Sequence, residues 1–121
     1  LTADTVRAMR LLAAERLVAE CGGSVLRLAG LYDHDHGAHA IYLSRERWAA
    51  DPDGLINQVH YSDAAAAVVS ALRRPSGGET LLVADDLPMS RSDICRAALR
   101  LPTYRHLQLP IFNGGAGGIG G

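Results

Sequence analysis

A histidine and a carboxylate stand three residues apart where an apolar segment leads into an alanine-rich one. His60 and Asp63 lie in LINQVHYSDAAAAVVSALRRP, residues 55–75. An imidazole can exchange a proton near neutral pH, and a neighbouring carboxylate can orient it. The pair can also be purely local, because Ser62 and Asp63 suit the unpaired amides at a helix N-terminus, with His60 bonded to backbone. The capping interpretation explains the residue types without chemistry, and both interpretations stay open.

Histidines and aspartates also gather in DHDHGAHA, residues 33–40. Imidazole nitrogens suit zinc, copper or nickel. The spacing matches no zinc signature, however, and a glycine interrupts it, so we expect a polar loop and assign no metal ligands. A metal-binding protein that uses this loop stays as a weaker alternative function. Its candidate ligands are Asp33, His34, Asp35, His36 and His39.

The chain finishes in a glycine-rich stretch that contains a formal GxGxxG pattern at Gly115, Gly117 and Gly120. That pattern works by placing a pyrophosphate at the N-terminus of a following helix. No helix follows in these residues. We therefore expect residues 114–121 to be a flexible tail and residues 1–113 to form the structured part.

Composition restricts the classes of partner. The chain is 48% apolar and 21% charged, which is typical of a soluble globular protein. Its net charge of −1 gives no electrostatic support for a nucleic-acid partner. No apolar run approaches the roughly 20 residues that span a membrane, so we expect no membrane partner. Cys21 and Cys95 belong to no CxxC pair, and we expect two buried thiols in a cytoplasmic protein.

Hydrophobic periodicity and turn residues divide the chain into alternating elements. Strands separated by helices favour an α/β fold with a parallel sheet. Two convincing strands are few for an independent sheet, so we expect an incomplete domain. The patterns predict helices over 4–21, 41–49, 63–73 and 91–100, and extended segments over 24–29, 56–60 and 79–84.

The predicted helices have recognisable ends and apolar faces. Ser90 with Asp93 forms a capping-box pattern, and Gly22 with Gly23 can end the first helix. In the helix over 63–73 we expect four side chains to face inward. These are Ala65, Val68, Val69 and Leu72.

Three blocks in order, SVLRLAGLY, LINQVHYSDAAAAVVSALRRP and ETLLVADDLPMSRSDICRAAL, resemble a known family. They are similar to the C-terminal half of atypical short-chain dehydrogenase/reductase proteins, in the NAD-dependent epimerase/dehydratase-like branch. The resemblance covers about residues 4–102. It implies the C-terminal part of a Rossmann-like parallel sheet with flanking helices, in a protein that binds NAD or NADP.

The resemblance also implies positions for the ligands. Residues at the end of the first strand would line the nicotinamide, and residues near the following helix would face a small-molecule substrate. The implied cofactor-binding residues are Leu28, Ala29, Gly30 and Leu31. The implied substrate-side residues are Tyr32, His60 and Asp63.

Two features depart from the family pattern. The Gly-rich turn that holds the dinucleotide belongs to the family's first strand and helix, which these residues do not include. The family's Tyr-x-x-x-Lys pair falls on Arg7 and Leu11, which cannot act as the acid/base and its partner, so no catalytic residue is assigned.

We therefore expect a fragment, inactive alone, of an NAD(P)-dependent epimerase/dehydratase- or oxidoreductase-like protein. Its substrate would be a carbonyl compound or a sugar-nucleotide-like molecule. The alternative is a non-enzymatic NAD(P)-sensing or interaction protein of the same fold, which the loss of the Tyr-x-x-x-Lys pair favours. The oligomeric state stays open.

Overall fold

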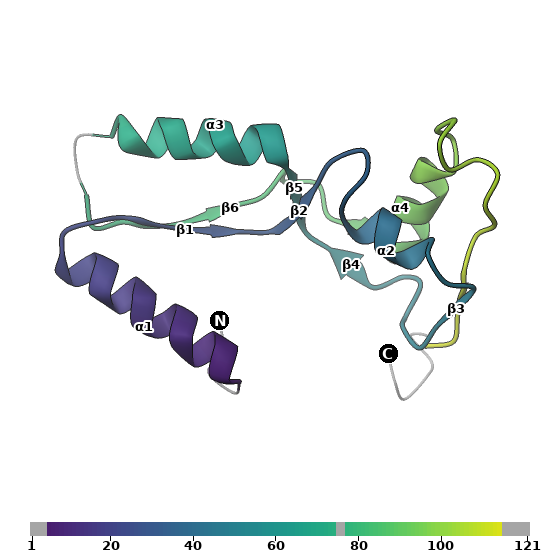
Figure 1. Ribbon diagram of the computed structural model, residues 1–121, viewed down its shortest axis with the longest axis horizontal. Helices are drawn as coiled ribbons and strands as arrows, with labels where there is room; N and C mark the ends of the chain where they lie inside the picture. Colours follow the sequence, from purple (N-terminus) through teal and green to yellow (C-terminus); the bar gives the residue numbers. More distant parts are fainter. Residues whose placement is uncertain (1–4, 75–76, 115–121) are drawn as a thin grey trace.

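The structure, a computed structural model, describes residues 5–74 and 77–114. Of the tail expected to be flexible, residues 114–121, all but Gly114 lies outside the described residues, and the Gly114 amide donates to the Ala50 carbonyl at 3.0 Å. Helices alternate along the chain with single strands or groups of strands (Figure 1). In order they are α1 (Val6–Glu20), β1 (Val25–Leu28), β2 (Gly30–Tyr32), α2 (Ala38–Tyr42), β3 (Arg47–Trp48), β4 (Leu55–Ile56), β5 (Gln58–His60), α3 (Tyr61–Leu72), β6 (Thr80–Val83), β7 (Met89–Ser90), α4 (Arg91–Ala98) and β8 (Ile111–Phe112).

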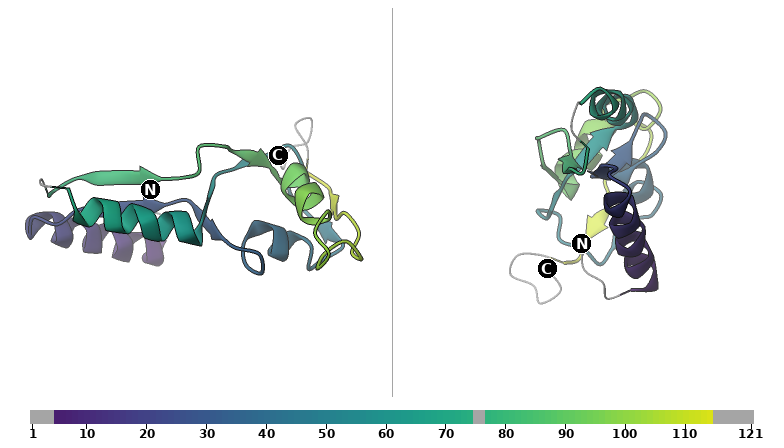
Figure 2. Two further views of the ribbon diagram at one scale, coloured as in Figure 1. Left: turned by 90° about the horizontal axis from the view of Figure 1, so that it is seen from above. Right: turned by 90° about the vertical axis from the view of Figure 1, so that its left-hand side faces the viewer.

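The strands form four two-stranded pairs, three of which are parallel. β1 pairs with β6, β2 with β5 and β3 with β8, whereas β4 and β7 are antiparallel. α1 and α3 run alongside the β1·β6 pair at one end of the elongated molecule, and α2 and α4 lie at the other end (Figures 1 and 2). The predicted mixed α/β class with parallel strands is confirmed.

Local side-chain hydrogen bonds begin the helices. The Thr5 hydroxyl accepts a hydrogen bond from the Ala8 amide at 3.0 Å and caps α1. Ser90 accepts from the Asp93 amide at 3.1 Å, so the predicted cap of α4 is confirmed. Gly22, with a φ of 78°, occupies the left-handed conformation that ends α1.

The predicted helix over 41–49 is wrong. Helix α2 begins three residues earlier and ends at Tyr42, because Gly37 takes a φ of 126° and turns the chain directly into the helix. The indole Nε1–H of Trp48 then donates to the Tyr42 carbonyl at 2.8 Å, and the chain extends to pair with β8. Trp48 and Arg47 are therefore strand residues.

The hydrophobic core lies between α2 and α4. Leu43, Cys95 and Ala98 form a buried cluster, against which Tyr42, Leu99, Tyr104 and Phe112 pack. Burial raises the pKa of the Cys95 thiol to about 11, so it behaves as a small apolar side chain. Cys21 is exposed at the end of α1, and the expectation of two buried thiols is wrong for it.

The other end of the molecule buries little. In α3 only Ala64 is buried; Ala65, Val68, Val69 and Leu72 are all exposed, against expectation. Leu82 of β6 is 82% exposed. These side chains are exposed because the sheet here has only two strands. Parallel sheets are normally covered by helices on both faces, and two strands offer too little surface for the helices to cover. Among the described helices, none is long and apolar enough to cross a bilayer.

One ion pair joins the first helix to the sheet. The Arg27 guanidinium of β1 donates to both carboxylate oxygens of Glu15 in α1, at 3.0 and 2.6 Å. This hydrogen bonding lowers the pKa of Glu15 and raises that of Arg27. The contact fixes the position of α1 beside β1, although both groups meet solvent and their pairing contributes little to stability.

We predict that Leu43→Ala and Leu82→Ala differ sharply in their effect on folding. Leu43 is 7% exposed in the core cluster, so its truncation leaves a cavity and lowers the free energy of unfolding by about 2–5 kcal/mol. Leu82→Ala removes an exposed side chain and changes it by less than about 0.5 kcal/mol. Denaturant unfolding of both variants checks this, and equal losses would contradict the location of the core.

Candidate functional site

Two implied substrate-side residues end paired parallel strands. Tyr32 is the last residue of β2, His60 is the last residue of β5, and the strand register places them opposite each other. Their rings meet edge to face, with centroids 5.2 Å apart. Ligands of α/β proteins bind at the carboxyl ends of parallel strands, and both side chains lie at that edge.

His60 caps α3 through its own imidazole. Its Nδ1 accepts from the Ser62 amide at 3.1 Å and lies 2.9 Å from the Ser62 hydroxyl. The helix therefore begins at Tyr61, and the expectation that Ser62 caps a helix starting at residue 63 is wrong. Because Nδ1 accepts an N–H bond, the neutral ring carries its proton on Nε2. Nε2 makes no hydrogen bond to any residue that the structure describes.

Asp63 lies close to this pair but outside the cavity. It sits in the first turn of α3, where a negative charge suits the helix dipole, and it is exposed. Its carboxylate affects the pKa of the Tyr32 phenol only through its charge. Burial is the main cause that raises this pKa, and the negative charges of Asp85 and Asp63 raise it further. Tyr32 is therefore a hydrogen-bond donor at neutral pH and not a base.

A cavity of about 380 Å³ opens beside these two rings. Strand residues and the loop after β2 form one side, and α4 with the segments around it forms the other. Sequence reasoning missed Gln58 and the α4 wall, although Gln58 stands two residues before His60 and so shares its strand face. The lining residues are Tyr32, Asp33, His34, His39, Gln58, His60, Met89, Ile94, Ala97, Ala98 and Leu101.

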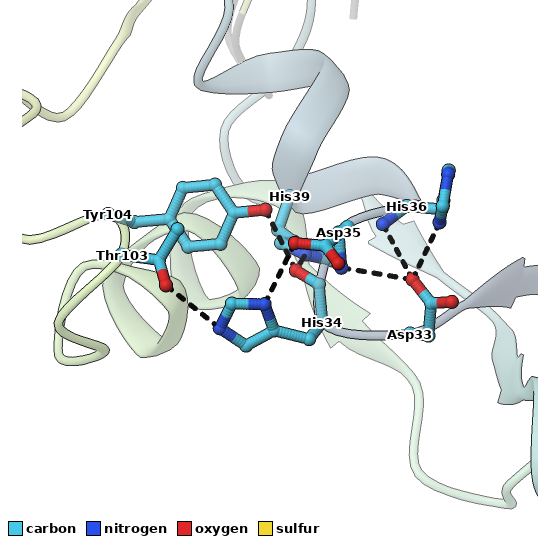
Figure 3. Close-up of polar contacts among 7 residues, drawn as sticks. All are labelled: Asp33, His34, Asp35, His36, His39, Thr103 and Tyr104. Carbon is cyan, nitrogen blue, oxygen red and sulfur yellow. Dashed lines mark hydrogen bonds and ion pairs between the residues drawn. The ribbon is translucent and has the colours of Figure 1, made fainter.

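The loop after β2 is organised by one carboxylate (Figure 3). Asp33 accepts hydrogen bonds from the amides of Asp35 and His36, at 2.9 and 2.8 Å, and contacts His36 Nδ1 at 2.9 Å. The bond to the His36 ring is the main cause that lowers the Asp33 pKa. Asp33 is thus an ionised anchor for the loop.

The remaining histidines of the loop bind protein groups. His39 is buried, and its Nε2 donates to the His34 carbonyl at 2.9 Å. The Tyr104 hydroxyl donates to the same carbonyl at 2.8 Å, and the Thr103 hydroxyl lies 3.1 Å from His34 Nε2 (Figure 3). In the part of the chain that the structure describes, no three histidine, cysteine or acidic side chains are placed to hold a metal ion. The geometry therefore gives the metal-binding alternative no support.

The implied cofactor-binding segment, residues 28–31, pairs with β6 in its first half and with the β5 side in its second half. The Ala29 amide donates to Val83 of the β6 end at 2.9 Å, and the next amide, of Gly30, donates to Asn57 before β5 at 3.2 Å. Gly30 and Leu31 line a second cavity of about 420 Å³, which Trp48 and α2 also border. Leu28 and Ala29 do not line it. The structure thus separates the four residues into two pairs.

Arg7 and Leu11, which the resemblance places at the Tyr-x-x-x-Lys positions, belong to α1. Both are exposed, and neither lines the cavity beside Tyr32 and His60. The polar groups that reach this cavity come instead from β2, β5 and the loop after β2.

Comparison with known proteins gives a structural likeness and no family. No family model matches the chain, and no curated protein matches it. A solved structure of a functionally unknown conserved protein from Silicibacter pomeroyi DSS is similar, with a TM-score of 0.72 and 26% sequence identity. The match covers 93% of this chain and 40% of that one. The chain therefore shares the α/β arrangement of a part of a larger protein.

We predict that His60→Ala and His60→Asn separate the capping role of this residue from its other contacts. Alanine cannot accept the Ser62 amide bond, so His60→Ala lowers the free energy of unfolding by about 1 kcal/mol. Asparagine is a good N-cap, so His60→Asn restores most of that loss. Denaturant unfolding measures both changes, and an asparagine variant no more stable than the alanine variant would contradict the cap.

We predict that alkaline pH destabilises the fold partly through Tyr32. The pKa of Tyr32 is raised in the folded state, whereas an unfolded tyrosine has a pKa of about 10. The folded protein therefore holds the proton longer, so this contribution to stability is complete below about pH 10 and disappears as pH rises through the folded pKa. The free energy of unfolding, measured against pH, should fall less steeply in Tyr32→Phe. Tyr61→Phe, which removes an exposed phenol, is the control, and identical slopes in the two variants would contradict the prediction.

Proposed function

We propose that this chain forms the late strands and substrate side of a Rossmann-like, NAD(P)-binding domain of the atypical short-chain dehydrogenase/reductase type. The observation that carries the proposal is the placement of Tyr32 and His60 at the carboxyl ends of paired parallel strands, beside a cavity. That edge is where such domains bind their ligands.

The topology supports the proposal. From β1 the chain passes through α3 and returns to β6, which pairs with β1 in parallel. A parallel pair joined through a helix is the repeating unit of Rossmann-like sheets. The three sequence blocks that resemble the family fall in order on β1–β2, β4–α3 and β6–α4.

The amount of exposed surface supports a larger domain. The chain exposes 8449 Å², whereas a compact monomer of 12.8 kDa exposes about 6,300 Å². Val6, Met9 and Leu17 of α1, and Leu72 of α3, are each more than half exposed. Further strands beside β1 and β6 would cover these side chains, as in a full parallel sheet.

The residues present fit the nicotinamide end of the cofactor. Gly30 is exposed, and a Cβ at this position would meet only the Asn57 carbonyl, at 3.4 Å, so a flat ring has room to approach the backbone. NAD(P), when bound, supplies hydride transfer. The chain's own contribution is to present the backbone of Gly30 and Leu31 to the ring from the second cavity, and to direct the Tyr32 hydroxyl and His60 Nε2–H toward a substrate in the first.

A non-enzymatic NAD(P)-sensing protein of the same fold is the second candidate. The specific observation in its favour is that Arg7 and Leu11 replace the acid/base pair and lie away from the cavity. An assay of hydride transfer from NAD(P)H to a carbonyl substrate by the intact protein distinguishes the enzyme from the sensor. Turnover supports the enzyme, and tight NAD(P)H binding without turnover supports the sensor.

We predict that NAD(P)H binding needs more of the domain than these 121 residues. Energy transfer from Trp48, the single tryptophan, to NADH or NADPH reports binding. The chain alone should bind neither with micromolar affinity, and a longer protein that includes a preceding Gly-rich strand–turn–helix should bind one of them.

Two variants of the longer protein test the contact at Gly30. Gly30→Val should weaken binding at least about tenfold, because its branched side chain would occupy the space of the ring. Gly30→Ala is the matched control and should bind nearly as well as the unchanged protein. Micromolar binding by the 121-residue chain, or none by the longer protein, would contradict the proposal.

A further inference from the structure

The side-chain amide of Gln58 opens into the cavity and pairs with no described residue. The residue is 7% exposed and lines the cavity beside Tyr32 and His60. Its backbone carbonyl accepts from the Asp85 amide at 2.9 Å, but its side chain makes no hydrogen bond to any described residue. No buried side-chain nitrogen or oxygen of the described residues lacks a partner, so the Gln58 amide is open to water in the cavity. A ligand that enters must therefore replace that water with a hydrogen bond of its own.

The side chains of Gln58 and His60 lie on the same face of β5. They stand two residues apart on the strand, with Val59, which is 1% exposed, directed to the opposite face. Two residues of strand separate their backbones by roughly 6–7 Å. The Gln58 amide and the His60 Nε2–H can therefore reach one small ligand from the same wall.

Neither lysine nor arginine lines the cavity to balance an anion. The chain contains no lysine, and none of its 12 arginines lines this cavity, whose wall lies wholly within the described residues. The ionised side chain on the wall is Asp33, which repels negative charge. A phosphate or carboxylate that entered would lose its hydration beside this carboxylate and without a lysine or arginine partner, which is unfavourable.

The facing wall is apolar. Met89, Ile94, Ala97 and Leu101 contribute hydrocarbon or thioether surface, and no hydrogen-bonding side chain. Such a wall favours the ring or alkyl part of a ligand, because burying it removes apolar surface from water. The cavity thus combines polar groups on one side, Gln58 and His60 among them, with an apolar surface on the other.

We propose that this cavity binds an uncharged carbonyl compound or amide with an apolar ring or chain, and that Gln58 is its specificity-determining residue. The Gln58 amide pairs with the ligand's carbonyl or amide group, and His60 Nε2–H donates to the carbonyl oxygen. The inference rests on the proposed function, because that function makes this strand edge the substrate side. Of the two substrate classes implied there, the cavity selects the carbonyl compound, and the diphosphate of a sugar nucleotide would have to lie outside it.

Cyclohexanecarboxamide and cyclohexanecarboxylate test the charge preference, since they share shape and differ in charge. In a ¹H–¹⁵N NMR titration of the chain, the carboxamide should bind at least about tenfold more tightly than the carboxylate and shift the Gln58 side-chain amide signals. If the amide spectrum of the chain alone is not that of a folded protein, the titration uses the longer protein that contains it. Equal or tighter carboxylate binding, or binding of neither probe, would overturn the proposal.

Two substitutions one residue apart test the role of Gln58. Gln58→Leu keeps the side-chain size and removes the amide, so carboxamide affinity should fall about tenfold. Asn57→Leu makes the same kind of change at an exposed neighbour outside the cavity lining, and should leave the affinity unchanged. Equal affinities in the two variants would overturn the assignment.

Failure of the ligand proposal can be distinguished from failure of the proposed function, because probe binding and NAD(P)H binding are measured separately. Probe binding with the expected preference, together with no NAD(P)H binding by the longer protein, would leave the ligand class standing and remove the proposed function. NAD(P)H binding without the probe preference would do the reverse. If the probes bind with the expected preference, His60→Asn should also lower carboxamide affinity, because asparagine keeps the cap but has a shorter donor side chain.

Discussion

The exchange of strand partners at Ala29 and Gly30 determines where every other element lies. Ala29 is the last residue to donate toward the β6 strand, and Gly30 is the first to donate toward β5. Up to that point the chain belongs to the β1·β6 pair with its flanking helices. Beyond it, β2 pairs with β5 and carries the chain toward α2 and α4 (Figure 1). Without the exchange, Tyr32 and His60 would not stand opposite each other at one strand edge.

The two parts divided by this exchange obtain stability in different ways. The part with α2 and α4 has its own buried cluster around Cys95, and the candidate cavity borders it on α4. The part with α1, β1, α3 and β6 is held by strand hydrogen bonds and the Arg27–Glu15 contact, and it leaves its apolar side chains exposed. Exposed apolar surface of this extent marks a face that another structure covers. The cavity, by contrast, is formed by residues within the described chain, which is why its chemistry can be argued from them.

Elements with strong local signals were predictable from the sequence, and features that depend on distant contacts were not. Apolar runs bounded by glycine or polar residues predicted β1 and β6, and the Ser90 capping pattern predicted the start of α4. The position of α2 depends on the backbone of Gly37 and on the Trp48 indole, neither of which helical periodicity reports. The inward face of α3 was assigned from helical periodicity alone, which does not report how little of the helix a two-stranded sheet covers. The structure brings Tyr32 and His60, both named from the resemblance, opposite each other in paired strands. Gln58 was missed because a glutamine in a short strand has no distinctive pattern until its pairing is known.

The two interpretations of His60, a helix cap or a group for chemistry, are not exclusive. A serine in the same position would cap α3 equally well but would present nothing to the cavity. The imidazole has two nitrogens, and the cap uses one of them: because Nδ1 accepts the Ser62 amide, the neutral ring must hold its proton on Nε2. The helix thereby fixes both the orientation and the tautomer of the ring, and the edge contact with Tyr32 restricts its rotation further. A donor held in this way needs little reorganisation when a carbonyl oxygen arrives, so the capping bond is itself the physical basis for a binding role of His60.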